Sequence, residues 1–307
     1  MLQRLLHHTH TLSPTEKSMG IITLAMFLIP GLDAIAKLLT ADLSPIQIGC
    51  VRFGLQALLL GTLLIRSDKI LPARHVLLRL MMAGFWIAGS AGFLFWGLSY
   101  LPLANNTAIF FVEPLILMLI SAALLGESIQ RYQYLAVIVG LLGAMVVIRP
   151  NWEAYGAAAL LPLLAATCFA SHVATLRHLS SHIGSLASQF WISLFACMWM
   201  ALAVLSGELF EIEFLQWRAM NMEQSSLLLL MAVVATLAFG LVSIALKRAP
   251  ASLLAPFQYL EIISATALGY LIFGDYPDGL TWLGTFIILG SGLYLFYRER
   301  RTQQLLR

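Results

Sequence analysis

Residues 101–127, LPLANNTAIFFVEPLILMLISAALLGE, and residues 249–275, APASLLAPFQYLEIISATALGYLIFGD, follow one pattern. A shift of 148 positions superposes the prolines, central glutamates, glycines and final acidic residues: Pro102 and Pro250, Glu113 and Glu261, Gly126 and Gly274, Glu127 and Asp275. An ionised carboxylate surrounded by hydrocarbon is unfavourable and is usually functional. Because each copy carries one near its centre, the repeat favours a membrane transporter built from two related halves.

The composition predicts that most of the chain lies in a membrane. Of its 307 residues, 60% are hydrophobic and 11% are charged, whereas soluble domains carry about 25% charged residues. Apolar segments close to the ~20 residues that span a bilayer recur along the chain. The ten expected spans are 19–39, 44–66, 76–98, 103–125, 130–148, 155–177, 184–205, 225–246, 251–273 and 278–297. We therefore expect an all-α integral membrane protein with ten transmembrane helices.

The basic residues predict how these helices are oriented. With the N-terminus in the cytoplasm, inner loops and tails hold fourteen of the eighteen Lys and Arg residues. The outer loops hold only Arg149 and Arg218, and Lys37 and Arg52 lie within helices. Cytoplasmic loops are enriched in Lys and Arg. This bias predicts that both termini are cytoplasmic, and we expect the bacterial inner (plasma) membrane.

Five spans per half make the second half enter the membrane upside down. The expected organisation is an N-terminal tail, two five-helix repeats and a C-terminal tail, at residues 1–18, 19–148, 155–297 and 298–307. Glu113 and Glu261 each fall about ten residues into a span, which is about 15 Å and close to the bilayer midplane. Inverted repeats with a site at the midplane are typical of transporters that work by alternating access.

The two central patterns also resemble a known family. Pro102, an apolar run, Glu113-Pro114-Leu115, a second apolar run and Gly126-Glu127 are similar to the EamA domain of the drug/metabolite transporter superfamily. The resemblance spans about residues 19–297 as two tandem units. It implies ten helices, cytoplasmic termini and transport of small organic solutes. The second unit departs from the pattern, because Ile262 stands in place of Pro114 and Asp275 in place of Glu127.

Residues 32–37, LDAIAK, resemble one branch of this superfamily more closely. That branch contains bacterial importers of riboflavin and of S-adenosylmethionine, which implies uptake of an aromatic or heterocyclic metabolite. Other members of the superfamily export aromatic amino acids, other amino acids and toxic compounds. Export of amino acids or drugs is therefore the alternative, and the direction stays open.

Glu113 and Glu261 are the first candidates for substrate recognition or proton coupling. A carboxyl group removed from water binds a proton more readily, and nearby cations oppose this. Because the basic residues Lys37 and Arg52 belong to the first half, we expect Glu261 to carry a proton and Glu113 to contact substrate or a cation. The alternative is that both are protonated, hydrogen-bonded packing residues.

The first span carries a second group of candidates. Asp33 and Lys37 are spaced i, i+4 in the order that favours an ion pair on a helix. Pro30-Gly31 precedes them, and predicts a kink or break like those of discontinuous binding helices. Lys37 could equally reach the outer surface with Asp33 as its counter-ion. Arg52 would bind an anionic substrate group, or pair with Asp33 or Asp42 to lock an outer gate.

Aromatic and polar residues complete the candidate set. Trp86, Phe93 and Trp96 of the third span could stack on a flat ring in the pathway, or pack against helices and lipid. Further polar candidates lie in the two spans that carry the glutamates or in the sixth span: Asn106, His172, Gln258 and Tyr259. His172 could transfer protons or be a neutral hydrogen-bonded residue.

Other motifs are missing from the sequence. It has no GxxxxGK[ST] loop, no His/Cys cluster at metal-ligand spacing and no GxSxG motif. We expect no enzyme activity, cofactor, metal or nucleic-acid partner. The expected partners are a small-molecule substrate and the lipid bilayer, with proton coupling as a hypothesis and a monomer or homodimer as the assembly. The rival classes are an integral-membrane enzyme acting on lipids and a channel or receptor-like scaffold.

Overall fold

The computed structural model describes residues 14–64, 72–125, 131–176, 179, 183–248, 254 and 257–305. Every regular element in these ranges is a helix. Eight helical segments there are long and apolar enough to cross a membrane, and Leu260–Phe273 and Gly279–Leu295 are shorter apolar helices. The chain is therefore an all-helical integral membrane protein. Gly126, Glu127 and Pro250 of the repeated pattern lie outside the described residues.

Within its described residues, the first half contains six helices where five spans were expected. They are α1 (Pro14–Leu39), α2 (Pro45–Leu64), α3 (Arg74–Leu98), α4 (Leu103–Phe110), α5 (Glu113–Leu125) and α6 (Arg131–Tyr155). Helix α1 already begins at Pro14, within the expected tail 1–18. Helix α6 continues past Pro150, beyond the expected end of the fifth span at 148. Apolar length predicts the membrane crossing, and the helices extend beyond it.

The second half has the same order of long helices. It contains η2 (Gly156–Leu160), α7 (Leu161–Leu176), α8 (Ser185–Leu209), η3 (Glu213–Leu215), α9 (Met222–Arg248), α11 (Leu260–Phe273) and α12 (Gly279–Leu305). Helix α12 remains helical to Leu305, within the expected C-terminal tail 298–307. Short η2 joins α6 to α7 directly, so the two halves follow each other without a long linker.

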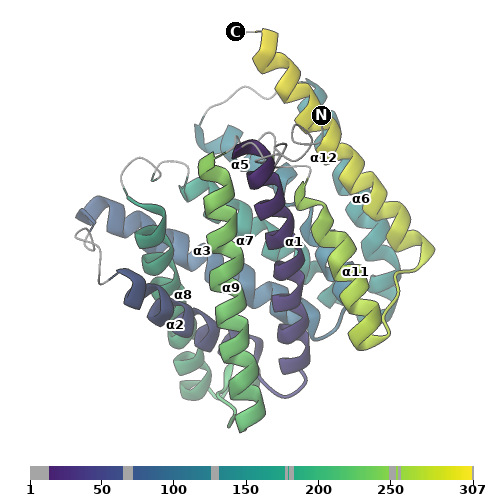
Figure 1. The fold of residues 1–307 in the computed structure, drawn as a ribbon. Helices are drawn as coiled ribbons and strands as arrows, with labels where there is room; N and C mark the ends of the chain where they lie inside the picture. Colours follow the sequence, from purple (N-terminus) through teal and green to yellow (C-terminus); the bar gives the residue numbers. More distant parts are fainter. Residues whose placement is uncertain are drawn as a thin grey trace, which may run out of the picture.

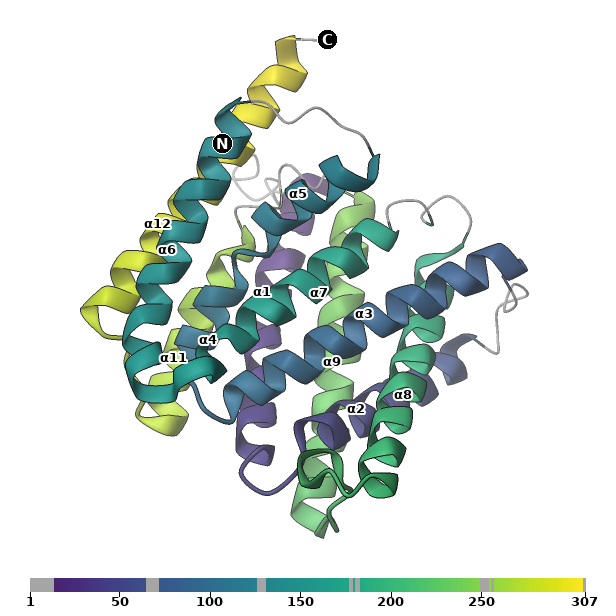
Figure 2. The same ribbon diagram turned by 180° about the vertical axis from the view of Figure 1, so that it is seen from behind.

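The helices form a bundle in which the two halves interlock. Figures 1 and 2 show α1, α9 and α11 on one face and α3, α4, α5 and α7 on the opposite face. Helices α2 and α8 pack together at one edge, and α6 and α12 at the other. Helix α1 begins, and α12 ends, on the side called here the terminus side; α1 ends and α12 begins on the opposite side.

The fourth expected span is interrupted. It divides into α4 and α5 at Phe111-Val112, so a single helix over 103–125 is wrong. Pro114 explains the interruption, because it has no N–H to donate and its ring excludes the carbonyl oxygen four residues earlier. That carbonyl belongs to Phe110, the last residue of α4. The break lies directly before Glu113, in the middle of the bundle.

Helix α1, by contrast, is continuous. It runs from Pro14 to Leu39 with Pro30 inside it, so the break expected at Pro30-Gly31 is wrong. The two prolines differ in their effect because surrounding helices can maintain a helix through a proline inside a membrane protein. Contacts with α9 and α11 flank α1 here. The discontinuous helix of the first half is thus the fourth span.

Glycines allow the closest helix contacts. At Gly84 of α3, an added Cβ would lie 2.6 Å from Cβ of Phe195 on α8. Between α6 and α12, a Cβ on Gly284 would lie 2.6 Å from the carbonyl oxygen of Gly143. Backbones approach this closely only where side chains are absent. The α6–α12 pair therefore depends on Gly143 and Gly284.

Gly284→Ala should destabilise the protein, because the new methyl group overlaps α6. Overpacking of this kind typically costs about 1–3 kcal/mol. The matched control is Gly290→Ala on the same helix, where nothing lies within 4 Å of the added Cβ. That change should be neutral or stabilising, because alanine favours a helix by about 0.5–1 kcal/mol over glycine. Thermal unfolding of the purified protein in detergent measures both; equal midpoints would contradict the packing argument.

Candidate functional site

A cavity of about 810 Å³ lies inside the bundle and is lined by both halves. The first half contributes residues of α1 to α5, and the second half contributes residues of α7, α8 and α9 together with Gln258 and Glu261. The break before Glu113 lies in its wall, so a gap between α4 and α5 helps to form it. Small-molecule sites of transporters typically lie between two halves in this way.

The cavity reaches the terminus side of the bundle. In α7, α8 and α9 its lining lies within residues 169–176, 185–193 and 239–247, which belong to the terminus half of each helix. Gly184 and Lys247, at the terminus ends of α8 and α9, are both exposed and line it. The cavity therefore opens toward the terminus side.

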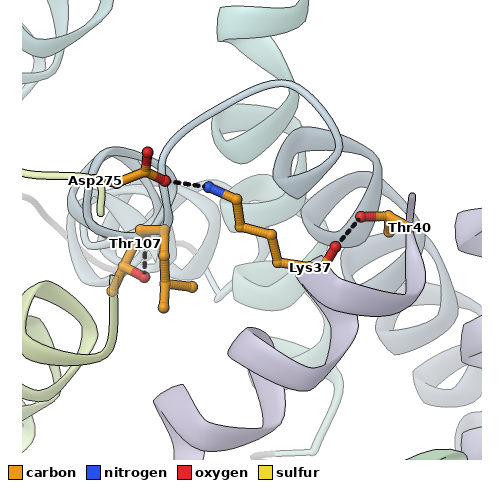
Figure 3. Close-up of polar contacts among 5 residues, drawn as sticks. Lys37, Thr40, Thr107 and Asp275 are labelled. Carbon is orange, nitrogen blue, oxygen red and sulfur yellow. Dashed lines mark hydrogen bonds and ion pairs between the residues drawn. The ribbon is translucent and has the colours of Figure 1, made fainter. Parts of the chain in front are cut away.

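An ion pair joins the first and second halves on the opposite side. Nζ of Lys37, near the end of α1, lies 2.5 Å from Oδ2 of Asp275, which follows α11 (Figure 3). The two side chains are 16% and 31% exposed. Thr40 donates its hydroxyl to the carbonyl oxygen of Lys37 and holds the end of α1. The expected Asp33–Lys37 ion pair is wrong, because the second half supplies a closer carboxylate.

The segment between α8 and α9 covers the same side. Gln47 of α2 and the backbone of Arg218 exchange two hydrogen bonds, of 2.8 and 3.0 Å. The Arg218 guanidinium donates to the carbonyl oxygen of Asp42 at 3.0 Å. Ser44 donates to the carbonyl oxygen of Phe214 at 2.7 Å. This segment therefore bridges the two halves beside the Lys37–Asp275 pair.

Asp33, Arg52 and Glu261 form the charged centre of the cavity. Asp33 and Arg52 are 6% and 5% exposed, and Asp33 interacts electrostatically with Arg52 and with Glu261. The Arg52 guanidinium lies over two rings, 4.3 Å from the centroid of Phe53 and 5.8 Å from that of Phe239. The expected lock between Arg52 and Asp42 is wrong. Asp42 instead accepts from Gln224 at 3.0 Å.

Glu113 and Glu261 line the same cavity although their helices belong to different halves. Gln258 also lines it. Tyr259 does not: its ring packs on Phe111 at 5.8 Å, and its hydroxyl lies beside Gly292 of α12. Glu261 interacts electrostatically with Asp33 of the first half, so a charged residue of one half lies near the central glutamate of the other.

One ring nitrogen of His172 is hydrogen-bonded to a neighbouring helix, and the rest of the ring faces the cavity. Its Nδ1 lies 2.8 Å from the carbonyl oxygen of Ala83 on α3. A carbonyl oxygen can only accept, so Nδ1 carries the proton, and Nε2 of the neutral ring is an acceptor. His172 can thus accept a hydrogen bond from a solute while it fixes α7 to α3.

The aromatic candidates of the third span lie elsewhere. Trp86 packs on Phe85, and the ring of Trp96 lies 4.3 Å from that of Phe214 in the α8–α9 segment, tilted by 34°. Neither these two nor Phe93 is among the residues that line the cavity in the described chain. Phenylalanines of five helices line it instead: Phe53, Phe95, Phe110, Phe111, Phe169 and Phe239. Sequence periodicity could not show which aromatic face meets the cavity.

Asn106 is buried beside α3, donates to the carbonyl oxygen of Leu94 at 3.3 Å, and is not itself among the described residues that line the cavity. Sequence analysis missed Gln56, Ser90, Gln189 and Ser193, which do line it. Gln56 follows Arg52 by one helical turn, so i, i+4 spacing offered a signal for it. The serines and Gln189 have no comparable signal in a single sequence.

Comparison with known proteins agrees with this architecture. The EamA-like transporter family matches the chain twice, over residues 17–149 and 156–297. A solved crystal structure aligns with 90% of this chain and 96% of its own, with a TM-score of 0.58 and 18% identity, and shares the fold.

Relatives with named functions are transporters. A riboflavin transporter of Vibrio cholerae is 29% identical over 67% of this chain and 67% of its own length. The pseudopaline exporter CntI of Pseudomonas aeruginosa is 26% identical over 88% of this chain and 92% of its own. An S-adenosylmethionine uptake transporter of Rickettsia bellii is 23% identical over 88% and 89%. With two family matches that together span most of its length, the chain belongs to the EamA-like transporter family.

Proposed function

We propose that this protein is a secondary transporter that moves a small organic metabolite by alternating access. The observation that carries the proposal is the cavity between the two halves, open toward the terminus side and covered on the opposite side. A solute that enters such a cavity leaves on the far side once the covering contacts separate. The proposed solute contacts are Asp33, Arg52, Glu113, His172, Gln258 and Glu261.

We further propose that the ten spans form two inverted five-helix repeats, at residues 19–148 and 155–297. Contacts between the halves support this, because they occur in matched pairs. The α1–α9 contact corresponds to α7–α3, and α2–α9 corresponds to α8–α3. The contacts α2–α8 and α6–α12 each join one span to its own counterpart. A two-fold relation between the halves produces this pattern.

In this proposal the protein lies in a bacterial inner membrane with both termini in the cytoplasm. The Lys and Arg bias supports that orientation. The cavity then opens to the cytoplasm, and the Lys37–Asp275 pair closes the outer side. The named relatives include importers and an exporter, so the proposal assigns a class of solute and leaves the direction to the gradients. Coupling to protons is part of the proposal.

Saturable counterflow tests the transport function. Purified protein in liposomes preloaded with riboflavin or S-adenosylmethionine should accumulate the same labelled solute from outside. Protein-free liposomes are the control. Turnover of liposome lipid without counterflow of any solute would favour the rival membrane enzyme and contradict the proposal.

Lys37→Ala or Asp275→Ala should open the cavity more often to the opposite side. Because the pair is partly exposed, it contributes up to about 1 kcal/mol, a change of roughly two- to fivefold in the closed-to-open ratio. The readout is the labelling rate of Ser193→Cys, in a variant without native cysteines, by an impermeant reagent added from that side. Ser193 lines the cavity and is 3% exposed.

Asp278→Ala is the matched control, since Asp278 follows α11 too but only caps α12, accepting from the backbone of Thr281 at 2.8 Å. It should not change the labelling rate. Exchanging the charges, with Lys37→Asp and Asp275→Lys together, should restore slow labelling. Equal labelling rates in all variants would show that the ion pair does not control access from the opposite side.

Glu261→Gln should flatten the pH dependence of transport from about pH 5.5 to about pH 8 while solute binding is retained. Repulsion between Glu261 and Asp33 is relieved when one of them binds a proton, and glutamine imitates that state. Glu113→Gln should instead weaken solute binding. Flux and affinity measured across this pH range distinguish the two roles. Glu223→Gln, an exposed position at the start of α9, is the control; a wild-type pH profile for Glu261→Gln would exclude the proton role.

A further inference from the structure

One face of α2 presents two buried polar groups without partners to the cavity. Arg52 and Gln56 are one helical turn apart and are 5% and 2% exposed. Among the described residues, Nε of Arg52 and Oε1 of Gln56 have no hydrogen-bond partner. A buried polar atom left without a partner is unfavourable, so native proteins rarely keep one without a reason. Both side chains line the cavity, where a ligand can satisfy them.

The charges around Arg52 and Gln56 are unevenly distributed. Asp33 of α1 interacts electrostatically with Arg52 on one side and with Glu261 on the other. Negative charge is therefore concentrated toward α1 and α11, and positive charge lies on α2. Phe53 and Phe239 flank the guanidinium of Arg52, which limits its freedom and excludes water from its faces. The guanidinium donors of Arg52 are thus held in position near two acceptors, the Asp33 carboxylate and Oε1 of Gln56.

We propose that Asp33, Arg52 and Gln56 form a subsite for a zwitterionic head group, with an ammonium and a carboxylate attached to one carbon atom, as in an α-amino acid. Arg52 binds the carboxylate, for which a guanidinium offers planar donors. The ammonium donates to Asp33 and to Oε1 of Gln56. The head group then satisfies both unpartnered atoms, and each of its charges faces the opposite charge.

The rest of the cavity is suited to the remainder of such a solute. Beyond the subsite, the wall carries Phe110, Phe111 and Phe169 together with His172. These side chains suit a flat, largely apolar group with a hydrogen-bond donor for Nε2 of His172. This assignment rests on the proposed transport function and narrows its solute to a zwitterion with an aromatic or heterocyclic body.

Three matched probes test the head group on the purified full-length protein. L-Tryptophan carries both charges, tryptamine only the ammonium, and indole-3-propionate only the carboxylate. Isothermal titration should show that tryptophan binds about tenfold more tightly than either of the others, because it alone makes both charge-assisted contacts. S-adenosylmethionine and its decarboxylated form provide a second pair with the same expected order.

Two variants should change this order in opposite ways. Arg52→Gln should weaken tryptophan and indole-3-propionate by about tenfold and leave tryptamine unchanged. Gln56→Met, of similar volume, should weaken tryptophan and tryptamine and leave indole-3-propionate unchanged. A variant that fails to fold weakens all three probes alike. Thermal unfolding of each variant identifies that case, and Arg52→Lys then replaces Arg52→Gln, with a smaller loss confined to the same two probes.

The subsite is overturned if the three probes bind equally, if a folded variant weakens all of them equally, or if neither zwitterion binds at millimolar concentration. Riboflavin has no ammonium–carboxylate pair, so its counterflow is independent of the subsite. Saturable riboflavin counterflow without zwitterion binding would keep the transport function and discard the subsite. Zwitterion binding without flux of any solute would support the subsite and contradict the transport function.

Discussion

The arrangement of this protein depends on how it holds charged side chains inside an apolar bundle. An isolated charge in hydrocarbon is strongly unfavourable, so such residues face one another or a polar cavity. Asp33, Arg52, Glu113 and Glu261 come from four different helices, yet all line one cavity. The break between α4 and α5, the interlocked halves and the open terminus side all make room for this shared polar volume.

The two halves are joined by interactions of two different kinds. On the opposite side, the halves meet through one partly exposed ion pair and a few hydrogen bonds from the α8–α9 segment. Contacts of this type are individually weak and exchange easily with water. Away from the cavity, α6 and α12 pack through Gly143 and Gly284 with almost no space between their backbones. The weak contacts thus lie where the proposed alternating access would require the halves to separate, and the tight contacts lie where it would not.

The arrangement also explains why the two central glutamates differ although they occupy equivalent positions. Glu113 begins α5 directly after a proline-induced break, whereas Glu261 is the second residue of α11. Asp33 approaches Glu261 from the other half, and Glu113 has Tyr259 nearby. Residues of one half lie beside residues of the other, so the two repeated glutamates acquire different neighbours.

The sequence by itself determined the membrane class, the number of apolar spans, the repeated glutamates and the family, because apolar length and the offset of 148 positions can be read along one dimension. It also identified six residues that line the cavity: Asp33, Arg52, Glu113, His172, Gln258 and Glu261. Only the tertiary structure decided that Lys37 pairs with Asp275, that Trp86, Phe93 and Trp96 lie outside the cavity, and that Gln56 lies inside it. These facts depend on the rotation of each helix about its axis and on contacts between residues more than 200 positions apart, as for Lys37 and Asp275. Packing between the halves determines the helix rotations and these contacts. The order of residues along the chain does not reveal that packing.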